Sequence, residues 1–154
     1  MQLTLHTDYS LRVLIYLAQK GDALSTISEV ASFYAISRNH LVKVVHHLAG
    51  ANFIQTLRGK NGGMRLARAP EDISVGDVVR QMEPNFDIVE CLSAGKGAGN
   101  HTCSVASICA LKNVLQKASR EFLALLDRYS LADAIVSGRQ AEIVFPPEQF
   151  KRDR

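Results

Sequence analysis

Apolar residues recur at helical spacing in three successive stretches of the first third of the chain. Steps of three and four residues place side chains on one face of a helix, so each stretch predicts an amphipathic helix. Thr7 is the expected N-cap of the first helix, with Asp8 in its first turn. Thr26 and Glu29 form a capping-box pattern at the start of the second helix, and Ser37 is the expected N-cap of the third. The expected buried positions are Leu11, Leu14, Ile15 and Ala18 in the first helix, Ile27, Val30, Ala31 and Tyr34 in the second, and Leu41, Val44, Val45 and Leu48 in the third.

Only residues 35–36 separate the second and third helices, which is the spacing of a helix-turn-helix. Residues 53–57 and 64–67 follow as two short strands. The glycine-rich turn between them contains Asn61-Gly62, a dipeptide favoured in β-hairpins. This order of elements predicts a mostly α fold with a small β-hairpin wing, a winged helix-turn-helix domain over residues 1–84.

Two further helices are expected, one from near Ser74 to just before Pro84 and a longer one after residue 110. The apolar stripe of the longer helix advances in alternating steps of four and three residues, as in a coiled-coil seam. A second copy of the chain is the simplest partner for this stripe and gives a two-fold homodimer; packing back on the winged domain is the alternative. The stripe consists of Leu111, Leu115, Ala118, Phe122, Leu125 and Tyr129. The remaining organisation is a cysteine-bearing, cluster-binding loop over 85–109, the dimerisation helix and its cap over 110–136, and a loose C-terminal tail over 137–154.

Charge is distributed unevenly along the chain, whose net charge is +3. Residues 1–68 contain eight Lys and Arg against three Asp and Glu, a net of +5, whereas residues 69–154 contain ten against twelve, a net of −2. No acidic residue lies between Glu29 and Glu71. A basic, acid-free segment favours double-stranded DNA as the partner over an ordinary solvated face.

The predicted recognition helix and wing contain the side chains suited to that partner. The start of a recognition helix reaches base edges in the major groove, where Arg pairs well with guanine and Asn with adenine, while Lys is the better phosphate anchor. A glycine-rich wing lets the backbone approach phosphates. A plain polar helix surface and a plain hairpin are the alternatives, and the spacing of the wing does not fit a phosphate-binding loop. The candidate DNA-binding residues are Ser37, Arg38, Asn39, His40 and Lys43 in the helix, and Arg58, Lys60, Asn61 and Arg65 in the wing.

All three cysteines, Cys91, Cys103 and Cys109, lie within nineteen residues. An odd number excludes a closed set of disulfides within one chain. Soft thiolates on a loop suit an iron–sulfur cluster, and zinc or a redox pair of Cys103 with Cys109 stays open. The lack of a C-x2-C pair argues against structural zinc. A metal would need a fourth ligand, and the candidates are His101, Glu90, Asp87 and Asp8.

Several classes of protein are disfavoured by the sequence. No run of about eighteen apolar residues predicts a membrane-spanning helix, and the N-terminus lacks the pattern of an export signal. A cytoplasmic protein with reduced thiols and no membrane partner is therefore expected. We find no nucleophile–base pair or paired carboxylates, so an enzyme is not expected.

Five segments resemble the NsrR/IscR family of dimeric bacterial iron–sulfur transcription regulators, over roughly residues 1–135. They are Leu3-Thr4-Leu5-His6-Thr7-Asp8-Tyr9, Ser37-Arg38-Asn39-His40-Leu41-Val42-Lys43, Arg58-Gly59-Lys60-Asn61-Gly62-Gly63, Gly76-Asp77-Val78-Val79-Arg80 and Leu126-Asp127-Arg128-Tyr129-Ser130-Leu131-Ala132-Asp133. The resemblance is closest to the NsrR branch, whose members repress nitrosative-stress genes and sense nitric oxide. It implies a repressor that binds a palindromic operator when loaded with a 4Fe–4S or 2Fe–2S cluster and releases it on exposure to nitric oxide. Sensing of iron or redox state, or a structural zinc or thiol site, are the alternatives.

The resemblance also implies a set of cluster ligands. Cys91, Cys103 and Cys109 match the ligating cysteines, and Asp8 matches an aspartate that completes the site from the other subunit. Asp8 also suits a first helical turn without any metal, because it favours the helix dipole. The chain departs from the IscR branch at Lys112, where that branch has histidine, and the gap between its first two cysteines is longer than usual, which brings His101 into consideration as a ligand.

Overall fold

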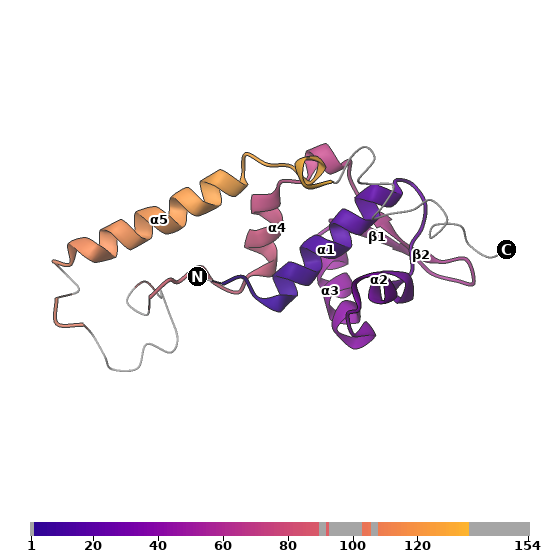
Figure 1. The fold of residues 1–154 in the computed structure, drawn as a ribbon, viewed down its shortest axis with the longest axis horizontal. Coiled ribbons are helices and arrows are strands. Elements are labelled where there is room, and N and C mark those ends of the chain that lie inside the picture. Colours follow the sequence, from indigo (N-terminus) through magenta and orange to yellow (C-terminus); the bar gives the residue numbers. More distant parts are fainter. Residues whose placement is uncertain (1, 90–91, 93–102, 106–107, 136–154) are drawn as a thin grey trace.

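The computed structural model describes residues 2–89, 92, 103–105 and 108–135 (Figure 1). Within them the chain forms a helical body with a two-stranded hairpin, and one long helix leaves this body. The elements are α1 (Leu5–Lys20), α2 (Ile27–Tyr34), α3 (Arg38–Gly50), β1 (Ile54–Leu57), β2 (Gly63–Leu66), the short 3-10 helix η1 (Pro70–Asp72), α4 (Val75–Met82), α5 (Ala110–Leu126) and the 3-10 helix η3 (Leu131–Ala134). The predicted mostly α fold with a hairpin wing is confirmed. The predicted tail over 137–154 and much of the cysteine loop lie outside the described residues.

Helix α1 begins one turn earlier than the sequence pattern predicts. Thr4, not Thr7, is its N-cap, and the Thr4 hydroxyl accepts a hydrogen bond from the Thr7 backbone N–H. Thr7 and Ser10 are buried, and the Ser10 hydroxyl donates to the His6 carbonyl at 2.7 Å. Because these small polar side chains satisfy themselves locally, they occupy the core face, which also contains Val13, Leu14 and Leu17. Of the predicted face, Leu14 is fully buried, and Leu11, Ile15 and Ala18 are half-buried and pack against the core.

The helix-turn-helix forms as predicted. The capping box is present: the Thr26 side chain accepts from the Glu29 backbone N–H, and the Glu29 carboxylate accepts from that of Thr26. Ala35 adopts a left-handed conformation with φ 52° and ends α2. Ser37 occupies the N-cap position of α3, but its side chain accepts no capping hydrogen bond. The four apolar positions predicted for α3 are all buried, namely Leu41, Val44, Val45 and Leu48.

The wing is an antiparallel pair in which Ile54 lies opposite Leu66 and Leu57 opposite Gly63. Its turn depends on Gly59, whose φ of 114° few other residues adopt, rather than on a two-residue Asn61-Gly62 turn. The base of the wing is tied to the segment before α2. Ser25 and Met64 exchange backbone hydrogen bonds of 2.9 and 2.8 Å. This pairing holds the wing beside the helix-turn-helix.

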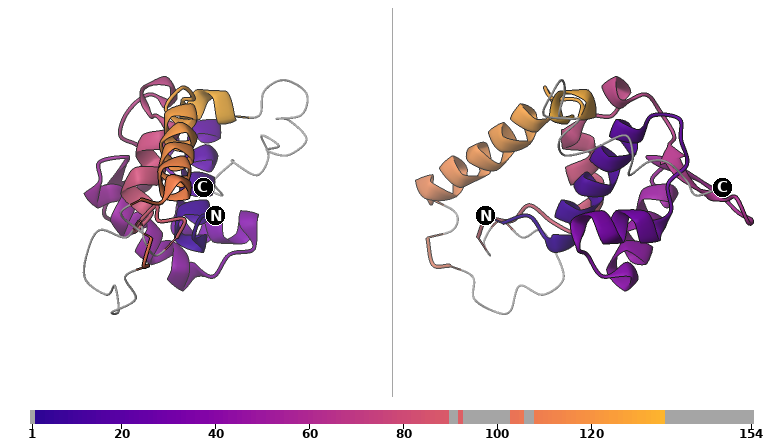
Figure 2. Two further views of the ribbon diagram at one scale, coloured as in Figure 1. Left: turned by 90° about the vertical axis from the view of Figure 1, so that its left-hand side faces the viewer. Right: turned by 45° about the vertical axis from the view of Figure 1, so that its right-hand side comes forward.

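Helix α5 projects away from the body and is joined to it near its C-terminal end (Figures 1 and 2). The residues after α5 return to the body, where Leu131 is buried in the core. None of the side chains of α5 itself is fully buried. Its exposed apolar residues include Leu111, Val114 and Leu125, and Tyr129 just beyond it. Leu115 and Phe122 of the stripe are half-buried, so within the described part of the chain the winged body covers the stripe only in part. No helix among the described residues is long and apolar enough to cross a membrane.

Candidate functional site

The outer face of α3 is polar and solvent-exposed. Arg38, Asn39, His40 and Lys43 are all exposed, as the sequence predicts. At 100° per residue, the centre of this face also includes the exposed His46, and Val42, which is 46% exposed, lies at its edge. An apolar side chain of this size can contact a thymine methyl group in the major groove. Sequence reasoning missed Val42 and His46, although His46 stands opposite the buried apolar residues of α3.

A groove of about 430 Å³ lies between α3, the start of α2 and the wing. Arg38 of α3 and residues of the wing both line this groove, although they lie about twenty positions apart in the sequence. Its lining is both polar and apolar: Ser25, Thr26, Ile27, Ser28, Arg38, Val45, Thr56, Leu57, Gly63 and Met64. The helix-turn-helix and the wing therefore form one continuous surface, as a DNA reader requires.

The four polar side chains that the sequence predicts for the wing, Arg58, Lys60, Asn61 and Arg65, are all exposed. Arg65 donates to the Gln55 side chain across the strands at 3.5 Å. Within the described part of the chain, no carboxylate forms an ion pair with a cationic side chain of the wing or of the outer face of α3. These positive charges are therefore available to a polyanion.

The first turns of α1 contact α3 through two pairs of rings. Tyr9 stacks on His40 with ring centroids 6.3 Å apart, and His6 Nε2 lies 3.0 Å from His47 Nδ1. Burial lowers the pKa of His6, the nearby His47 lowers it further, and Glu83 opposes both. His40 and His47 thus stand at the edge of the recognition face that meets α1. Sequence reasoning missed these contacts because they join residues more than thirty positions apart.

Asp8 lies between His6 and Tyr9 in the first turn of α1, as predicted. Its carboxylate forms an i,i+4 ion pair with Arg12, with an N–O distance of 2.9 Å. The side chain is 39% exposed. Among the described residues, no three His, Cys, Asp or Glu side chains are grouped closely enough to hold a metal ion. Asp8 is therefore not brought to a ligand cluster within the described part of a single chain.

The candidate thiol ligands are described in part. Cys103 and Cys109 are free thiols, the first exposed and the second half-buried at the N-cap of α5. Of the candidates for a fourth ligand, Asp87 is exposed and its backbone N–H donates to the Asn85 side chain at 3.2 Å. Cys91, Glu90 and His101 lie outside the described residues. Accessible, unpaired thiols are the donor type that an iron–sulfur cluster or zinc requires.

Comparisons with known proteins agree with this arrangement. The family described as Rrf2, iron-dependent transcriptional regulator, matches residues 3–137. The HTH-type transcriptional regulator NsrR of Bacillus subtilis is 47% identical over 136 residues, which are 88% of this chain and 90% of that protein. NsrR of Bacillus licheniformis is 48% identical over 138 residues, 89% of this chain and 94% of that protein. The structure of CymR, the global cysteine regulator of B. subtilis, has a TM-score of 0.68 at 24% identity, over 87% of this chain and 95% of that one, and supports the fold.

These relatives are transcription regulators and not enzymes, as the sequence predicts. The family match and the two regulators cover the recognition helix, the wing, the cysteines and α5 together. The chain therefore belongs to the Rrf2 family of transcriptional regulators.

Proposed function

We propose that this chain is a homodimeric repressor that binds a palindromic operator under the control of an iron–sulfur cluster, and that nitric oxide is its signal. The observation that supports this most is the continuous surface of α3 and the wing, in which Arg38 shares a groove with wing residues and no described carboxylate pairs with the surrounding cations. The regulators named NsrR support the DNA-binding role.

In this proposal α3 reads the major groove and the wing holds the backbone. Arg38 and Asn39, at the start of α3, are placed to pair with guanine and adenine edges. Lys43 and Lys60 neutralise phosphates. The Ser37 hydroxyl makes no capping bond and is available to a phosphate oxygen. The further contacts that we propose come from His40, Arg58, Asn61 and Arg65.

We further propose that Cys91, Cys103 and Cys109 hold the cluster. Cys103 and Cys109 fit this role because they are free, and Cys109 stands directly at the start of α5. When bound, an iron–sulfur cluster supplies iron with which nitric oxide reacts. The thiolates fasten the segment before α5 to the first turn of that helix. Since the exposed stripe of α5 is the proposed dimer seam, this fastening acts directly on the dimer.

Asp8 is the proposed fourth ligand, contributed by the partner subunit. Its carboxylate is partly exposed and its only described ion pair is the weak surface pair with Arg12, so it remains accessible. Its neighbours Tyr9 and His6 contact His40 and His47 on the recognition helix. A change in the ligation of Asp8 therefore shifts the first turn of α1, and the contacts of Tyr9 and His6 pass this shift to α3 of the same subunit. This links the state of the cluster to DNA binding.

Anaerobic purification of the full chain tests the proposal. Brown protein that contains iron and sulfide, enriches a palindrome from random duplexes and releases it on exposure to nitric oxide is the expected result. Colourless protein that contains zinc, and whose DNA binding does not respond to nitric oxide, would show that the cysteines hold a structural zinc ion and not a cluster. Iron-containing protein that responds only to iron supply or oxidation would show that the signal is not nitric oxide, while the cluster itself would stand.

Asp8→Ala tests the fourth ligand separately, with His101→Ala as the matched control. Asp8→Ala is expected to alter the cluster spectrum and weaken the nitric oxide response, while the dimer and non-specific DNA affinity stay intact. Because the Arg12 pair lies on the surface, its loss has little effect on folding. A normal spectrum in Asp8→Ala together with an altered one in His101→Ala would assign the fourth ligand to the loop histidine.

A further inference from the structure

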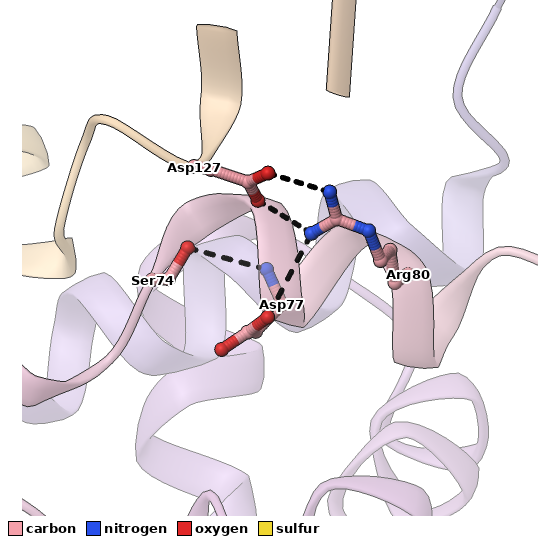
Figure 3. Close-up of polar contacts among 4 residues, drawn as sticks. All are labelled: Ser74, Asp77, Arg80 and Asp127. Atoms are coloured by element: carbon pink, nitrogen blue, oxygen red, sulfur yellow. Dashed lines mark hydrogen bonds and ion pairs between the residues drawn. The ribbon is translucent and has the colours of Figure 1, made fainter. Parts of the chain in front are cut away.

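Two of the segments that carry the family resemblance, residues 76–80 and 126–133, have no part in DNA reading or cluster ligation. The structure brings them together at the joint between α4 and α5 (Figure 3). The Arg80 guanidinium makes two parallel hydrogen bonds to the Asp127 carboxylate, of 2.5 and 2.6 Å. These residues are 47 positions apart. Such a planar, two-bond pairing restricts the relative orientation of the two elements that carry it.

Backbone contacts close the same joint from the other side. The Val75 N–H donates to the Tyr129 carbonyl at 2.9 Å, and the Leu131 N–H donates to the Ile73 carbonyl at 2.7 Å. Gly76 lets the two segments approach closely, because a Cβ there would lie 2.0 Å from Asp127 Oδ1 and 2.9 Å from its backbone nitrogen. The joint is thus built for one separation and one orientation.

The charges around Arg80 are organised toward Asp127. Asp77, one turn earlier on α4, lies 3.7 Å from Arg80 and is the weaker second partner. The backbone N–H of Asp77 donates to the Ser74 hydroxyl, which caps α4. The hydrogen bonds from Arg80 lower the pKa of the Asp127 carboxyl, so Asp127 is ionised at neutral pH. Both side chains are more than a third exposed, so the pair adds little to folding stability. Its fixed geometry therefore suggests a role in positioning α5 and not in stabilising the fold.

Among the described residues, α5 makes one further side-chain hydrogen bond, from Ser119 to the Phe86 carbonyl at 3.3 Å, and it also packs on α4. The helix has 17 residues and is about 25 Å long. A rotation of about 10° at its base moves its far end by about 4 Å, close to the rise of one base pair. The orientation at the joint therefore decides where a dimer built on α5 presents its two recognition helices.

We propose that Gly76, Arg80 and Asp127 form a positioning clamp that sets the angle between the winged domain and α5, and thereby the spacing of the two operator half-sites. The proposal rests on the dimeric, operator-binding function proposed above. In this proposal none of the three residues contacts DNA or the cluster. They are positioning residues, because they determine where α3 lies relative to α5. The clamp holds the winged domain and α5 as one rigid unit. A shift of α5 at the dimer seam therefore moves α3 by the same rotation and is not absorbed by bending between α4 and α5.

The experiment measures how affinity depends on half-site spacing. Wild-type protein selects its palindrome from random duplexes under anaerobic conditions, and that duplex is rebuilt with one base pair removed from or added to its centre. Wild type is expected to prefer the original spacing by about tenfold. Arg80→Ala and Asp127→Asn are expected to reduce this preference to about twofold, with affinity for a single half-site unchanged. A merely structural role would lower all these affinities together.

Two matched variants sharpen the result. Asp77→Asn removes the other carboxylate beside Arg80 without touching the link to Asp127, and should keep the wild-type preference. Arg80→Lys keeps the charge but lacks the two-bond geometry, so it should lose the preference as Arg80→Ala does. Full preference in Arg80→Lys would show that charge alone suffices and would overturn the clamp.

Further outcomes decide the rest. An unchanged spacing preference in Arg80→Ala and Asp127→Asn overturns the proposal, as does an equal loss on every duplex by folded protein. If Arg80→Ala fails to unfold cooperatively, Asp127→Asn carries the test, because the amide keeps the shape of the carboxylate. Wild-type protein that enriches no palindrome overturns the proposed function, and the clamp with it, before any variant is made.

Discussion

The winged body and helix α5 have the same kind of sequence pattern and different outcomes. In the body, the apolar side chains of α1 and α3 meet in one core, and residues such as Leu14, Leu41 and Leu48 are fully buried. In α5 the stripe is equally regular, yet Leu111 remains 62% exposed and Leu125 49% exposed. Periodicity thus identifies a helix and its apolar face but says nothing of the chain that covers that face.

The same contrast holds for polar chemistry. Within the described part of one chain, Arg38 and the base of the wing line one groove, and the other cationic side chains of α3 and the wing are exposed. Among the described residues, the thiols do not belong to a group of three or more side chains that could hold a metal ion. The first half of the molecule therefore presents the proposed DNA-reading surface within one chain, whereas the second half is expected to require a partner copy and a cofactor.

The largest expected effect is loss of the cluster from the second half of the chain. Cys91→Ser, Cys103→Ser and Cys109→Ser should each abolish the visible iron–sulfur absorption of anaerobically reconstituted protein, because only three thiols exist and none is spare. The dimer should survive, since the α5 stripe contains no thiol. Absorption spectra with iron and sulfide analysis provide the measurement, and full cluster content in one variant would remove that cysteine from the ligand set.

The next effect concerns the exposed stripe. The double substitution Leu111→Glu with Leu125→Glu should weaken the dimer by about 4 kcal/mol, roughly a thousandfold, because two apolar side chains of each subunit, already partly covered, lose about 1 kcal/mol of burial apiece. Thermal unfolding of the winged body should hardly change. Sedimentation at several concentrations measures the dimer, with Asn113→Glu on the opposite face of α5 as the control. A dimer of unaltered strength would assign the seam to another surface.

A smaller effect is expected at the start of the recognition helix. Arg38→Ala should weaken binding to the selected operator by about 1–3 kcal/mol and relax one base position, because a guanidinium fork that reads guanine is lost. Affinities on the operator, on single-base variants of it and on random duplexes provide the measurement. Equal losses on specific and random DNA would remove the base-reading role and leave Arg38 as a phosphate contact.

The smallest effect is expected at the wing tip. Lys60→Ala should weaken binding to all duplexes alike and reduce the slope of log affinity against log salt by about one unit, because one phosphate contact is lost. The measurement is a salt titration on operator and random DNA. An unchanged slope would place Lys60 away from the DNA backbone and restrict the reading surface to α3.

Local signals predicted the body well because they act over a few residues. The capping box of Thr26 and Glu29 and the buried row of α3 are decided within one or two turns. The same reasoning failed in α1, where Thr7 and Ser10 take core positions. Short hydroxyl side chains can be buried when they bond to their own helix, and a scheme that seeks only apolar residues overlooks them.

Contacts across the chain were beyond prediction from one sequence. The pairing of Arg80 with Asp127 and the ring contact of Tyr9 with His40 depend on how whole helices pack. The exposed arginine and lysine residues of α3 and the wing could be predicted, because their role depends on charge and on the order of elements. The ligand set remains a prediction, since Cys91 lies outside the described residues.

The tie between Ser25 and Met64 has an evolutionary consequence. It closes the base of the wing against the segment before α2, where a Cβ on Gly63 would lie only 2.8 Å from the Ser25 carbonyl oxygen. Insertions and substitutions there would disturb the whole helix-turn-helix. The constraints on the tip beyond Leu57 are local to the turn: Gly59 has a φ of 114°, and a Cβ on Gly62 would lie 2.3 Å from the Leu57 carbonyl oxygen. The exposed side chains of Arg58, Lys60 and Asn61 are free of these constraints and can change in charge. Relatives are therefore expected to vary in the charged side chains of the tip, and with them in overall DNA affinity, while the base stays constant and base preference changes at the start of α3.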